Sequence, residues 1–232
     1  MISFFVPIYN EEENLNQFLI GLKKFSETDF NRQNDFIFVD DGSDDNSRKL
    51  LEKFIMLEST NNKFKLITQN KNNGVGYAFK LALEKTDKKF IFFLPSDNDL
   101  EFKDIENLKN YLDYDFIMLY PQNFSKYSRN RYVLSMLFRL IYCYTFNTKV
   151  NYIQAPCLYN VELLKTLNIK SNRFNIWPEI NIKILRKKTK YIEIPVHFKN
   201  KSVIDRTVSI KNLLEIIKGY INLFIEIIIL KK

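Results

Sequence analysis

The chain has 232 residues, 46% of them hydrophobic, which is enough to bury a substantial core in one large domain. The absence of repeats and of long low-complexity tracts excludes a disordered or fibrous protein. The net charge is +8 and uneven, because residues 121–211 hold 17 Lys/Arg against 4 Asp/Glu. This basic region predicts attraction to phosphates, nucleic acid or an anionic membrane, with a solvated basic surface as the alternative.

The cysteines and the first residues indicate the cellular setting. Cys143 and Cys157 form neither a C-x-x-C motif nor a zinc-binding spacing, so we expect two small core residues in a reduced, cytoplasmic protein. The opening segment MISFFVPIYNEE has no basic stretch and only a very short apolar run. It therefore does not have the pattern of a signal peptide.

Five apolar segments, each followed by polar residues, predict strands at 2–6, 36–39, 64–68, 90–94 and 115–120. Apolar stripes at helical spacing follow the first three strands, and the first stripe comprises Leu15, Phe18, Leu19, Leu22 and Phe25. Strands that alternate with helices predict an α/β fold with a mostly parallel sheet and right-handed crossovers. The loops that follow the strands should then meet at one edge of the sheet, where ligands bind in such folds.

The loop after the fourth strand carries Asp97 and Asp99, two carboxylates one residue apart. Oxygen ligands of this kind favour Mg²⁺ or Mn²⁺ over zinc, whereas a turn or a helix cap is the alternative for so short a motif. The segments Tyr9-Asn10-Glu11 and Asp40-Asp41 follow the first and second strands. The topology predicts that all three acidic loops converge on one cleft, which is more specific than any single motif.

A Gly74-Val75-Gly76 segment precedes the third predicted helix. It lacks the third glycine of a dinucleotide-binding fingerprint and does not lie in the first strand–helix unit. We interpret these glycines as residues that let the helix pack closely beside the sheet.

Four segments, in this order, resemble the successive signatures of family 2 glycosyltransferases with the GT-A fold. They are VPIYNEEENL at 6–15, FVDDGSDDN at 38–46, NNGVGYAF at 72–79 and SDNDLE at 96–101. The polyprenyl- or dolichyl-phosphate sugar transferases are the most similar branch, because their D-A-D-L-Q corresponds to residues 97–101. The resemblance implies an inverting hexosyltransferase that uses a UDP- or GDP-sugar donor and a polyprenyl phosphate acceptor. A lipopolysaccharide or capsular glycan acceptor, and a catalytically weak nucleotide-sugar binder, are the alternatives.

The resemblance also implies roles for residues of the front half. Asp97 and Asp99 would hold a Mg²⁺ or Mn²⁺ ion that bridges the diphosphate, and Asp40 or Asp41 would bond the base or ribose. The other residues implied at the donor site are Pro7, Tyr9, Glu11, Gly74, Asn98 and Glu101.

The back half matches the family more loosely. Arg131 resembles the arginine of the family's R…S helix, and Lys201 and Arg206 stand near its R-x-x-G-x-S-K segment. Glu179 is the carboxylate that the motif places for a general base, which a hydroxyl acceptor needs and a phosphate does not. A structural ion pair is the alternative for Glu179. The chain departs from the family pattern at Gln122, Asn151, Lys201 and Ile204.

The tail predicts an amphipathic helix over 213–230, set apart from a catalytic domain at 1–211. Its polar residues Glu215, Lys218, Asn222 and Glu226 share a stripe about 80° wide. Three charges within the segment argue against a membrane-spanning helix. The helix should pack on the catalytic domain, pair with a second copy in a homo-oligomer, or lie in an anionic membrane interface. With the basic back half, it favours a cytoplasmic protein peripheral to the inner face of the membrane and no nucleic-acid partner.

Overall fold

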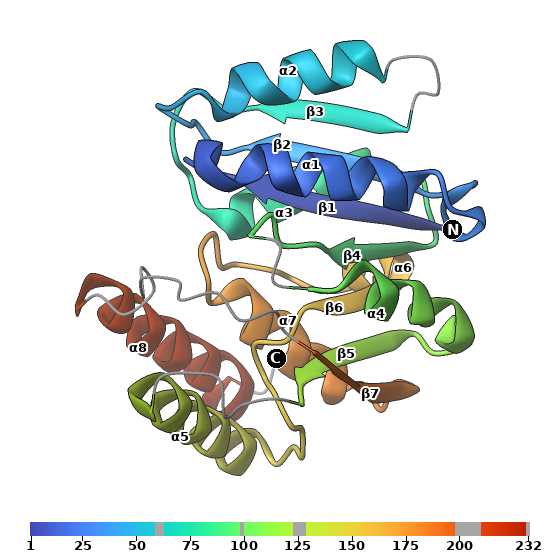
Figure 1. The fold of residues 1–232 in the computed structure, drawn as a ribbon. Helices are drawn as coiled ribbons and strands as arrows, with labels where there is room; N and C mark the ends of the chain where they lie inside the picture. The colour runs from blue at the N-terminus through green and yellow to red at the C-terminus, as the bar shows by residue number, and fades with distance from the viewer. Residues whose placement is uncertain (59–62, 98–99, 123–128, 198–209, 231–232) are drawn as a thin grey trace.

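The computed structural model describes residues 1–58, 63–97, 100–122, 129–197 and 210–230 (Figure 1). The elements in chain order are β1 (Ile2–Ile8), α1 (Glu12–Ser26), η1 (Asp29–Asn31), β2 (Asp35–Asp40), α2 (Ser47–Leu57), β3 (Phe64–Thr68), α3 (Val75–Lys85), β4 (Phe90–Phe93), α4 (Phe102–Glu106), η3 (Asn107–Tyr111), β5 (Phe116–Pro121), α5 (Arg129–Phe146), β6 (Cys157–Asn160), α6 (Val161–Lys165), α7 (Ile176–Leu185), β7 (Tyr191–Val196), α8 (Ile210–Phe224) and η5 (Ile225–Ile229). The two short elements η1 and η3 are 3₁₀ helices, and η5 is a π-helical continuation of α8.

The strands form one seven-stranded sheet in the order β3-β2-β1-β4-β6-β5-β7 (Figure 1). Only β6 runs against its neighbours β4 and β5, so the predicted α/β fold with a mostly parallel sheet is confirmed. Sequence analysis missed β6, because its four-residue segment CLYN is too short to show a period. The same strand buries Cys157, as expected of a small core residue, while Cys143 is partly buried.

The first strand is longer than predicted, because it continues through Pro7 to Ile8. The Leu94 N–H donates to the Phe5 carbonyl, and the pairing of β1 with β4 ends there. Pro7 lies two residues beyond this point, on the side of β1 that faces β4. Its lack of an N–H therefore costs no hydrogen bond between the two strands. Its carbonyl accepts a 3.0 Å hydrogen bond from the Ser96 hydroxyl instead.

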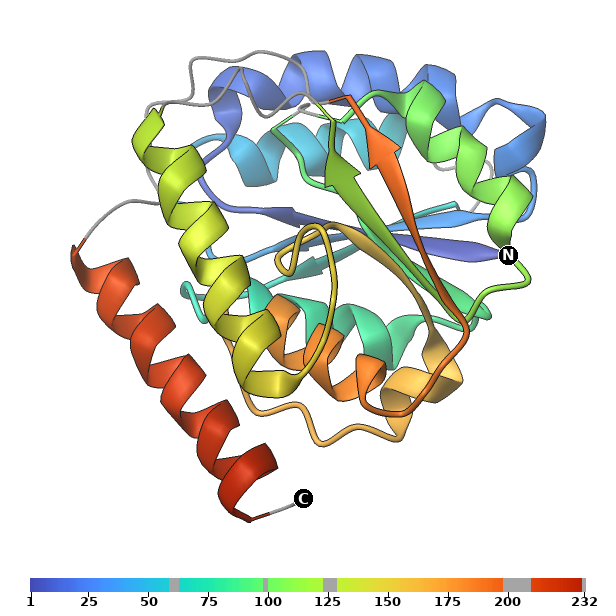
Figure 2. The same ribbon diagram turned by 90° about the horizontal axis from the view of Figure 1, so that it is seen from below.

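The sheet is buried on both faces, as the continuous apolar strands require. On one face, α1, α2 and α4 pack over aromatic side chains such as Phe4, Phe36 and Phe92. On the other face, α3, α5 and α7 cover Phe5 and Ile91, and Figure 2 shows the helices above and below the sheet. The predicted stripe of α1 is buried throughout: Leu15, Phe18, Leu19, Leu22 and Phe25.

The C-terminal helix α8 lies beside α5, away from the sheet (Figures 1 and 2). The Tyr220 ring meets Tyr142 at a centroid distance of 5.2 Å, and its hydroxyl is 2.7 Å from that of Thr145. Leu223 and Ile227 are buried in the same core cluster as α3 and α7. Among the described residues, no helix has both the length and the apolar character needed to cross a membrane.

Candidate active site

The loops after β1 and β2 are joined to each other by hydrogen bonds at the carboxyl edge of the sheet. The Asn10 N–H donates to Ser43 Oγ at 3.1 Å, and the Glu11 N–H donates to Ser47 Oγ at 2.9 Å. The Asp44 N–H returns a 2.9 Å bond to Asn10 Oδ1. Asn10 makes this turn with a φ of 53°, a conformation that asparagine tolerates better than most residues. The two predicted cleft loops therefore form one unit.

Asp41 fastens a third loop to this edge. Its carboxylate accepts hydrogen bonds from Gln69 Nε2 at 2.8 Å, from the Asn73 N–H at 2.9 Å and from the Gly74 N–H at 2.8 Å. Burial raises the pKa of Asp41, although the two backbone hydrogen bonds and the nearby charge of Arg173 oppose that rise. Asp41 therefore holds the loop after β3 against the end of β2.

Asp40 is fully buried and has its own partners. Its carboxylate pairs with Arg48 Nε at 2.8 Å and accepts a 3.2 Å bond from the Ser43 N–H. The same arginine donates to the Gln69 carbonyl at 2.5 Å. Both acids predicted to bond the base or ribose thus hold neighbouring loops in place, and their contact with a nucleotide stays a prediction.

The loop after β4 reaches the same edge. Ser96 is fixed to the Pro7 carbonyl, and Asp97 follows it directly. The Asp97 carboxylate is a hard oxygen donor of the kind that Mg²⁺ and Mn²⁺ prefer. The second predicted ligand, Asp99, lies outside the described residues together with Asn98, and elsewhere no described group of three or more His, Cys, Asp or Glu could hold a metal.

Two other predicted donor-site residues flank this edge. Tyr9 directly follows β1 and is 41% exposed. Glu101 is exposed and immediately precedes α4.

The glycine segment packs against the back half of the chain rather than against the sheet. Gly74 has a φ of +97°, and a Cβ there would lie 2.5 Å from the Asn172 carbonyl oxygen. A Cβ on Gly76 would lie 2.7 Å from the Asn172 carbonyl carbon, and the Tyr77 N–H donates to that carbonyl at 3.0 Å. We predicted that these glycines let the helix pack closely beside the sheet, and this was wrong. The segment that packs against them is a loop almost a hundred residues later in the sequence.

Glu179, the predicted general base, is buried in an ion pair. Its carboxylate accepts bonds from the Lys170 N–H at 2.9 Å, the Ser171 N–H at 2.8 Å and Lys183 Nζ at 2.8 Å. Burial by itself would raise the pKa of Glu179, but these three donors hold it below its usual value. The geometry matches the structural alternative, and a role as a base stays a prediction.

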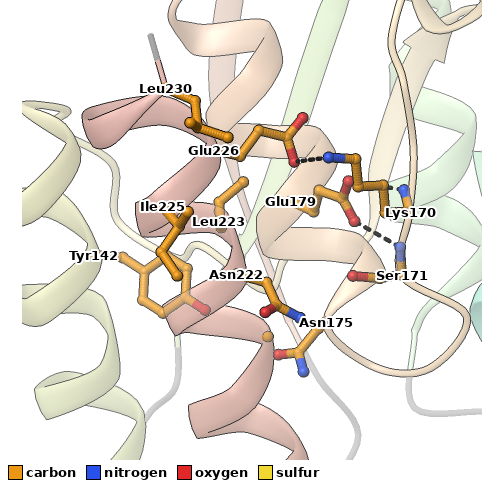
Figure 3. A pocket seen from close by; sticks show the side chains of 11 residues that line it. Tyr142, Lys170, Ser171, Asn175, Glu179, Asn222, Leu223, Ile225, Glu226 and Leu230 are labelled. Atoms are coloured by element: carbon orange, nitrogen blue, oxygen red, sulfur yellow. Dashed lines mark hydrogen bonds and ion pairs between the residues drawn. The ribbon is translucent and has the colours of Figure 1, made fainter. Parts of the chain in front are cut away.

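The same lysines tie α8 and η5 to this network. Lys183 Nζ lies 2.9 Å and Lys170 Nζ 3.0 Å from the Glu226 carboxylate. A pocket of about 300 Å³ opens between η5, α7 and the loop before α7 (Figure 3). One wall is apolar, with Tyr142 and Ile225, and the other carries the charged network. The segment 170–175 therefore lies between this pocket and the glycine loop.

The structure describes only part of the remaining residues predicted in the back half. Arg131 lies in α5, but its side chain is outside the described residues, as are Lys201 and Arg206. Arg173 was not predicted at this position: its Nε is 3.5 Å from Glu215, and its side chain would touch a Cβ at Gly74. No sequence signal separates Arg173 from the other bases of this region.

A family model and several known proteins match this sequence. The model of the family "Glycosyl transferase family 2" matches residues 3–168. The dolichyl-phosphate beta-glucosyltransferase of Dictyostelium discoideum is 30% identical over 113 residues, which are 47% of this chain and 34% of that protein. The undecaprenyl-phosphate 4-deoxy-4-formamido-L-arabinose transferase of Proteus mirabilis is 35% identical over 96 residues, 41% of this chain and 28% of that protein.

A third relative is the teichoic acid poly(glycerol phosphate) polymerase of Staphylococcus epidermidis, 33% identical over 99 residues that cover 43% of this chain and 13% of that protein. In these three cases the match therefore spans about a third of the relative's length or less.

A solved structure shares the whole architecture. Glucosyl-3-phosphoglycerate synthase from Mycobacterium tuberculosis, in complex with Mg²⁺ and uridine diphosphate, superimposes with a TM-score of 0.72 at 13% identity. The superposition covers 96% of this chain and 79% of that one, which confirms the predicted GT-A fold. The family model extends from β1 through α6, and so includes the whole carboxyl edge with its acidic and glycine loops. The chain therefore belongs to glycosyl transferase family 2.

Proposed function

We propose that this chain transfers a hexose, with inversion, from a UDP- or GDP-sugar to a polyprenyl phosphate. The observation that carries the proposal is the shared edge at which the loops after β1, β2, β3 and β4 are tied together. Asp41 holds the glycine loop there, and Ser96 brings the Asp97 loop against β1. A sheet edge with one carboxylate motif and the exposed Tyr9 suits a nucleoside diphosphate with its metal.

For the donor, Asp97 and the expected second ligand Asp99 would hold Mg²⁺ or Mn²⁺. Such an ion neutralises the charge that develops on the departing diphosphate. The structural relative was solved with Mg²⁺ and uridine diphosphate, and with Mn²⁺ in a second complex, which supports this class of donor and metal. Tyr9, Pro7 and Glu11 would then line the base and ribose.

For the acceptor, the engagement of Glu179 favours a phosphate over a hydroxyl. A phosphate oxygen is already ionised near neutral pH, so it attacks the anomeric carbon without a base, while the bond from that carbon to the diphosphate breaks. A sugar hydroxyl would need a general base, and Glu179 is held by Lys183 and two backbone N–H groups. The names of the dolichyl- and undecaprenyl-phosphate relatives point to the same acceptor class.

A glycan acceptor is the second candidate. The relative named as a teichoic acid polymerase matches 43% of this chain, and the acceptor-side segment departs from the family pattern at Lys201 and Ile204. A protein that binds the donor without transfer is a further outcome of the same test. Because polyprenyl phosphates are membrane lipids, the preferred function also implies work at the inner face of the cytoplasmic membrane.

The test is an assay of the purified full chain with UDP- and GDP-sugars, Mg²⁺ or Mn²⁺, and two sets of acceptors. Short polyprenyl phosphates should yield a sugar-phosphate product with inverted anomeric configuration, measured by NMR, and chelation should abolish it. Transfer only to saccharides would establish the glycan alternative. Calorimetry that shows metal-dependent nucleotide binding without turnover on any acceptor would establish the binding protein.

A further inference from the structure

The helices α5 and α8, with η5, expose apolar side chains on the side that faces away from the core. Representative members are Leu137, Ile141 and Tyr144 of α5 and Ile217, Ile221 and Ile228 of α8 and η5, all exposed by more than a third. We call this surface the outer face. The opposite side of each helix is buried, with Tyr142 on α5 and Leu223 on α8. Each helix therefore carries two apolar stripes, of which the core needs only one.

The two exposed stripes belong to neighbouring helices. The α5 members recur at intervals of four and three residues, and Ile217 and Ile221 lie one turn apart on α8. The helices lie side by side in both views, and Tyr220 joins them through its contact with Tyr142 (Figures 1 and 2). Exposed apolar surface concentrated in this way marks an interaction site.

The charges next to the outer face are of one sign. The acids of α8 and η5 are turned toward the body of the protein, where Glu215 pairs with Arg173 at 3.5 Å and Glu226 with Lys170 at 3.0 Å. Lys218 remains exposed. Among the described side chains of α8 and η5, the two acids are in these ion pairs and Lys218 is the exposed charge, so this side of the helix is apolar and basic.

We infer that the outer face docks on an anionic lipid bilayer and lies in its interface without crossing it. Basic residues beside such a surface are attracted by anionic headgroups, while apolar side chains enter the acyl boundary. Tyr144 is 92% exposed, and a tyrosine ring suits the boundary between headgroups and acyl chains.

The position of the outer face fits a lipid-borne acceptor. The inner side of α8 holds the segment 170–175, because Asn175 Nδ2 donates to the Glu215 carbonyl at 2.5 Å. That segment contacts Gly74 through Asn172, so the outer face and the donor edge are linked at one end of the molecule. In Figure 1, α5, α8 and the carboxyl ends of β1, β2 and β3 lie on the same side. The inference deepens the proposed membrane location and rests on it, but not on the identity of the acceptor.

The test is flotation of the full chain with phosphatidylcholine vesicles and with vesicles that also contain phosphatidylglycerol. The wild type should float only with the anionic vesicles, and raised salt should release it. Leu137→Asn and Ile221→Asn should each lower the partition coefficient by about tenfold, since each removes one inserted aliphatic side chain. Lys218→Glu should lower it about fivefold or more, because the charge is reversed near the headgroups.

The matched control is Ile20→Asn, which changes an isoleucine on α1 that is more exposed than Ile221, 64% against 47%, and lies outside the outer face. It should float like the wild type, and thermal unfolding should show that all four variants keep the fold. The inference is overturned if the wild type ignores anionic vesicles, or if Ile20→Asn loses as much binding as Ile221→Asn. It is also overturned if light scattering shows a dimer that Ile221→Asn dissociates, with no vesicle binding. Sugar transfer plays no part in this readout, so the inference and the proposed acceptor can fail separately.

Discussion

The front and back halves of this molecule hold their buried carboxylates in different ways. In the front half, Asp41 is satisfied mainly by backbone N–H groups of the neighbouring loop, at Asn73 and Gly74. In the back half, Glu179 and Glu226 share the ammonium group of Lys183 between two helical elements. Glu179 also accepts two backbone N–H bonds, but loss of the shared lysine would remove a partner from two carboxylates at once. Asp41 therefore depends mainly on the geometry of the loop after β3, whereas Glu179 and Glu226 are coupled through one lysine side chain.

The two arrangements also have opposite electrostatic consequences. Burial raises the pKa of Asp41, so the folded protein favours its protonated form more than the unfolded chain does. Burial opposes ionisation of Glu226 as well, but the lysine partners outweigh it and hold the pKa of this carboxyl below its usual value. Acid should therefore weaken the back half before it affects the donor edge.

The largest expected effect is on catalysis at the front. Asp97→Ala should lower kcat by about 10³-fold, because the departing diphosphate would face an acidic cleft without its metal. The fold should survive, since this acid follows a strand end and the core does not depend on it. Steady-state kinetics and thermal unfolding would measure both effects. Asp29→Ala, which removes an acid exposed by 89% far from this edge, is the control. Near-normal turnover of the Asp97 variant would show that this carboxylate is structural.

The next largest effect is on stability at the back. Lys183→Met should lower the free energy of unfolding by about 3 kcal/mol, because two buried carboxylates lose the cation between them. Chemical denaturation would measure it, with Lys187→Met as the control. Lys187 is exposed and donates a hydrogen bond to the Thr166 hydroxyl. The free energy of unfolding of its variant should therefore differ from that of the wild type by less than about 0.5 kcal/mol. Equal losses in the two variants would contradict the shared-lysine arrangement.

The contact between the two halves should come third. Gly74→Ala should cost about 2 kcal/mol, because alanine resists a positive φ and its Cβ would collide with the Asn172 carbonyl. Donor affinity, measured by calorimetry with UDP, should fall with it, since the loop held by Asp41 would shift. Gly21→Ala provides the comparison, because a Cβ there would lie 2.9 Å from the Phe102 ring, a clash with a side chain that involves neither a positive φ nor a backbone atom. A larger loss of stability in Gly21→Ala than in Gly74→Ala would show that packing of Gly74 against Asn172 is not a major contribution to stability.

The smallest effect concerns pH. The folded-state pKa of Glu179 lies below its ordinary value of 4.5, so its contribution to stability is present above that pH and is lost as the pH falls through the folded value. Urea denaturation between neutral pH and pH 3 should show this loss, and Glu179→Gln should flatten it. Glu162→Gln removes an exposed acid from an i,i+3 pair and should leave the slope unchanged. A wild-type profile that is flat below 4.5 would mean that the lysine partners do not favour the ionised form.

Much of the fold could be predicted because its signals are local. Continuous apolar runs marked the parallel strands, and helical spacing marked the stripe of α1 from Leu15 to Phe25. The antiparallel strand β6 was not predicted, because a segment of four residues is too short to show the alternation that distinguishes a strand from a loop. The continuation of β1 through Pro7 also escaped, because whether a proline ends a strand depends on the partner strand beside it.

The sequence by itself determined the family, the α/β class and the convergence of the acidic loops, since each rests on residues close together in the chain and on the handedness of crossovers. Only the tertiary structure decided what those residues touch. It placed Asn172 against Gly74, put Lys183 between Glu179 and Glu226, and turned the acids of α8 inward. The physical reason is range: Asn172 with Gly74 and Lys183 with Glu226 join segments whose separation along the chain carries no pattern, so packing alone selects them, whereas the i,i+4 pair of Glu179 and Lys183 is local.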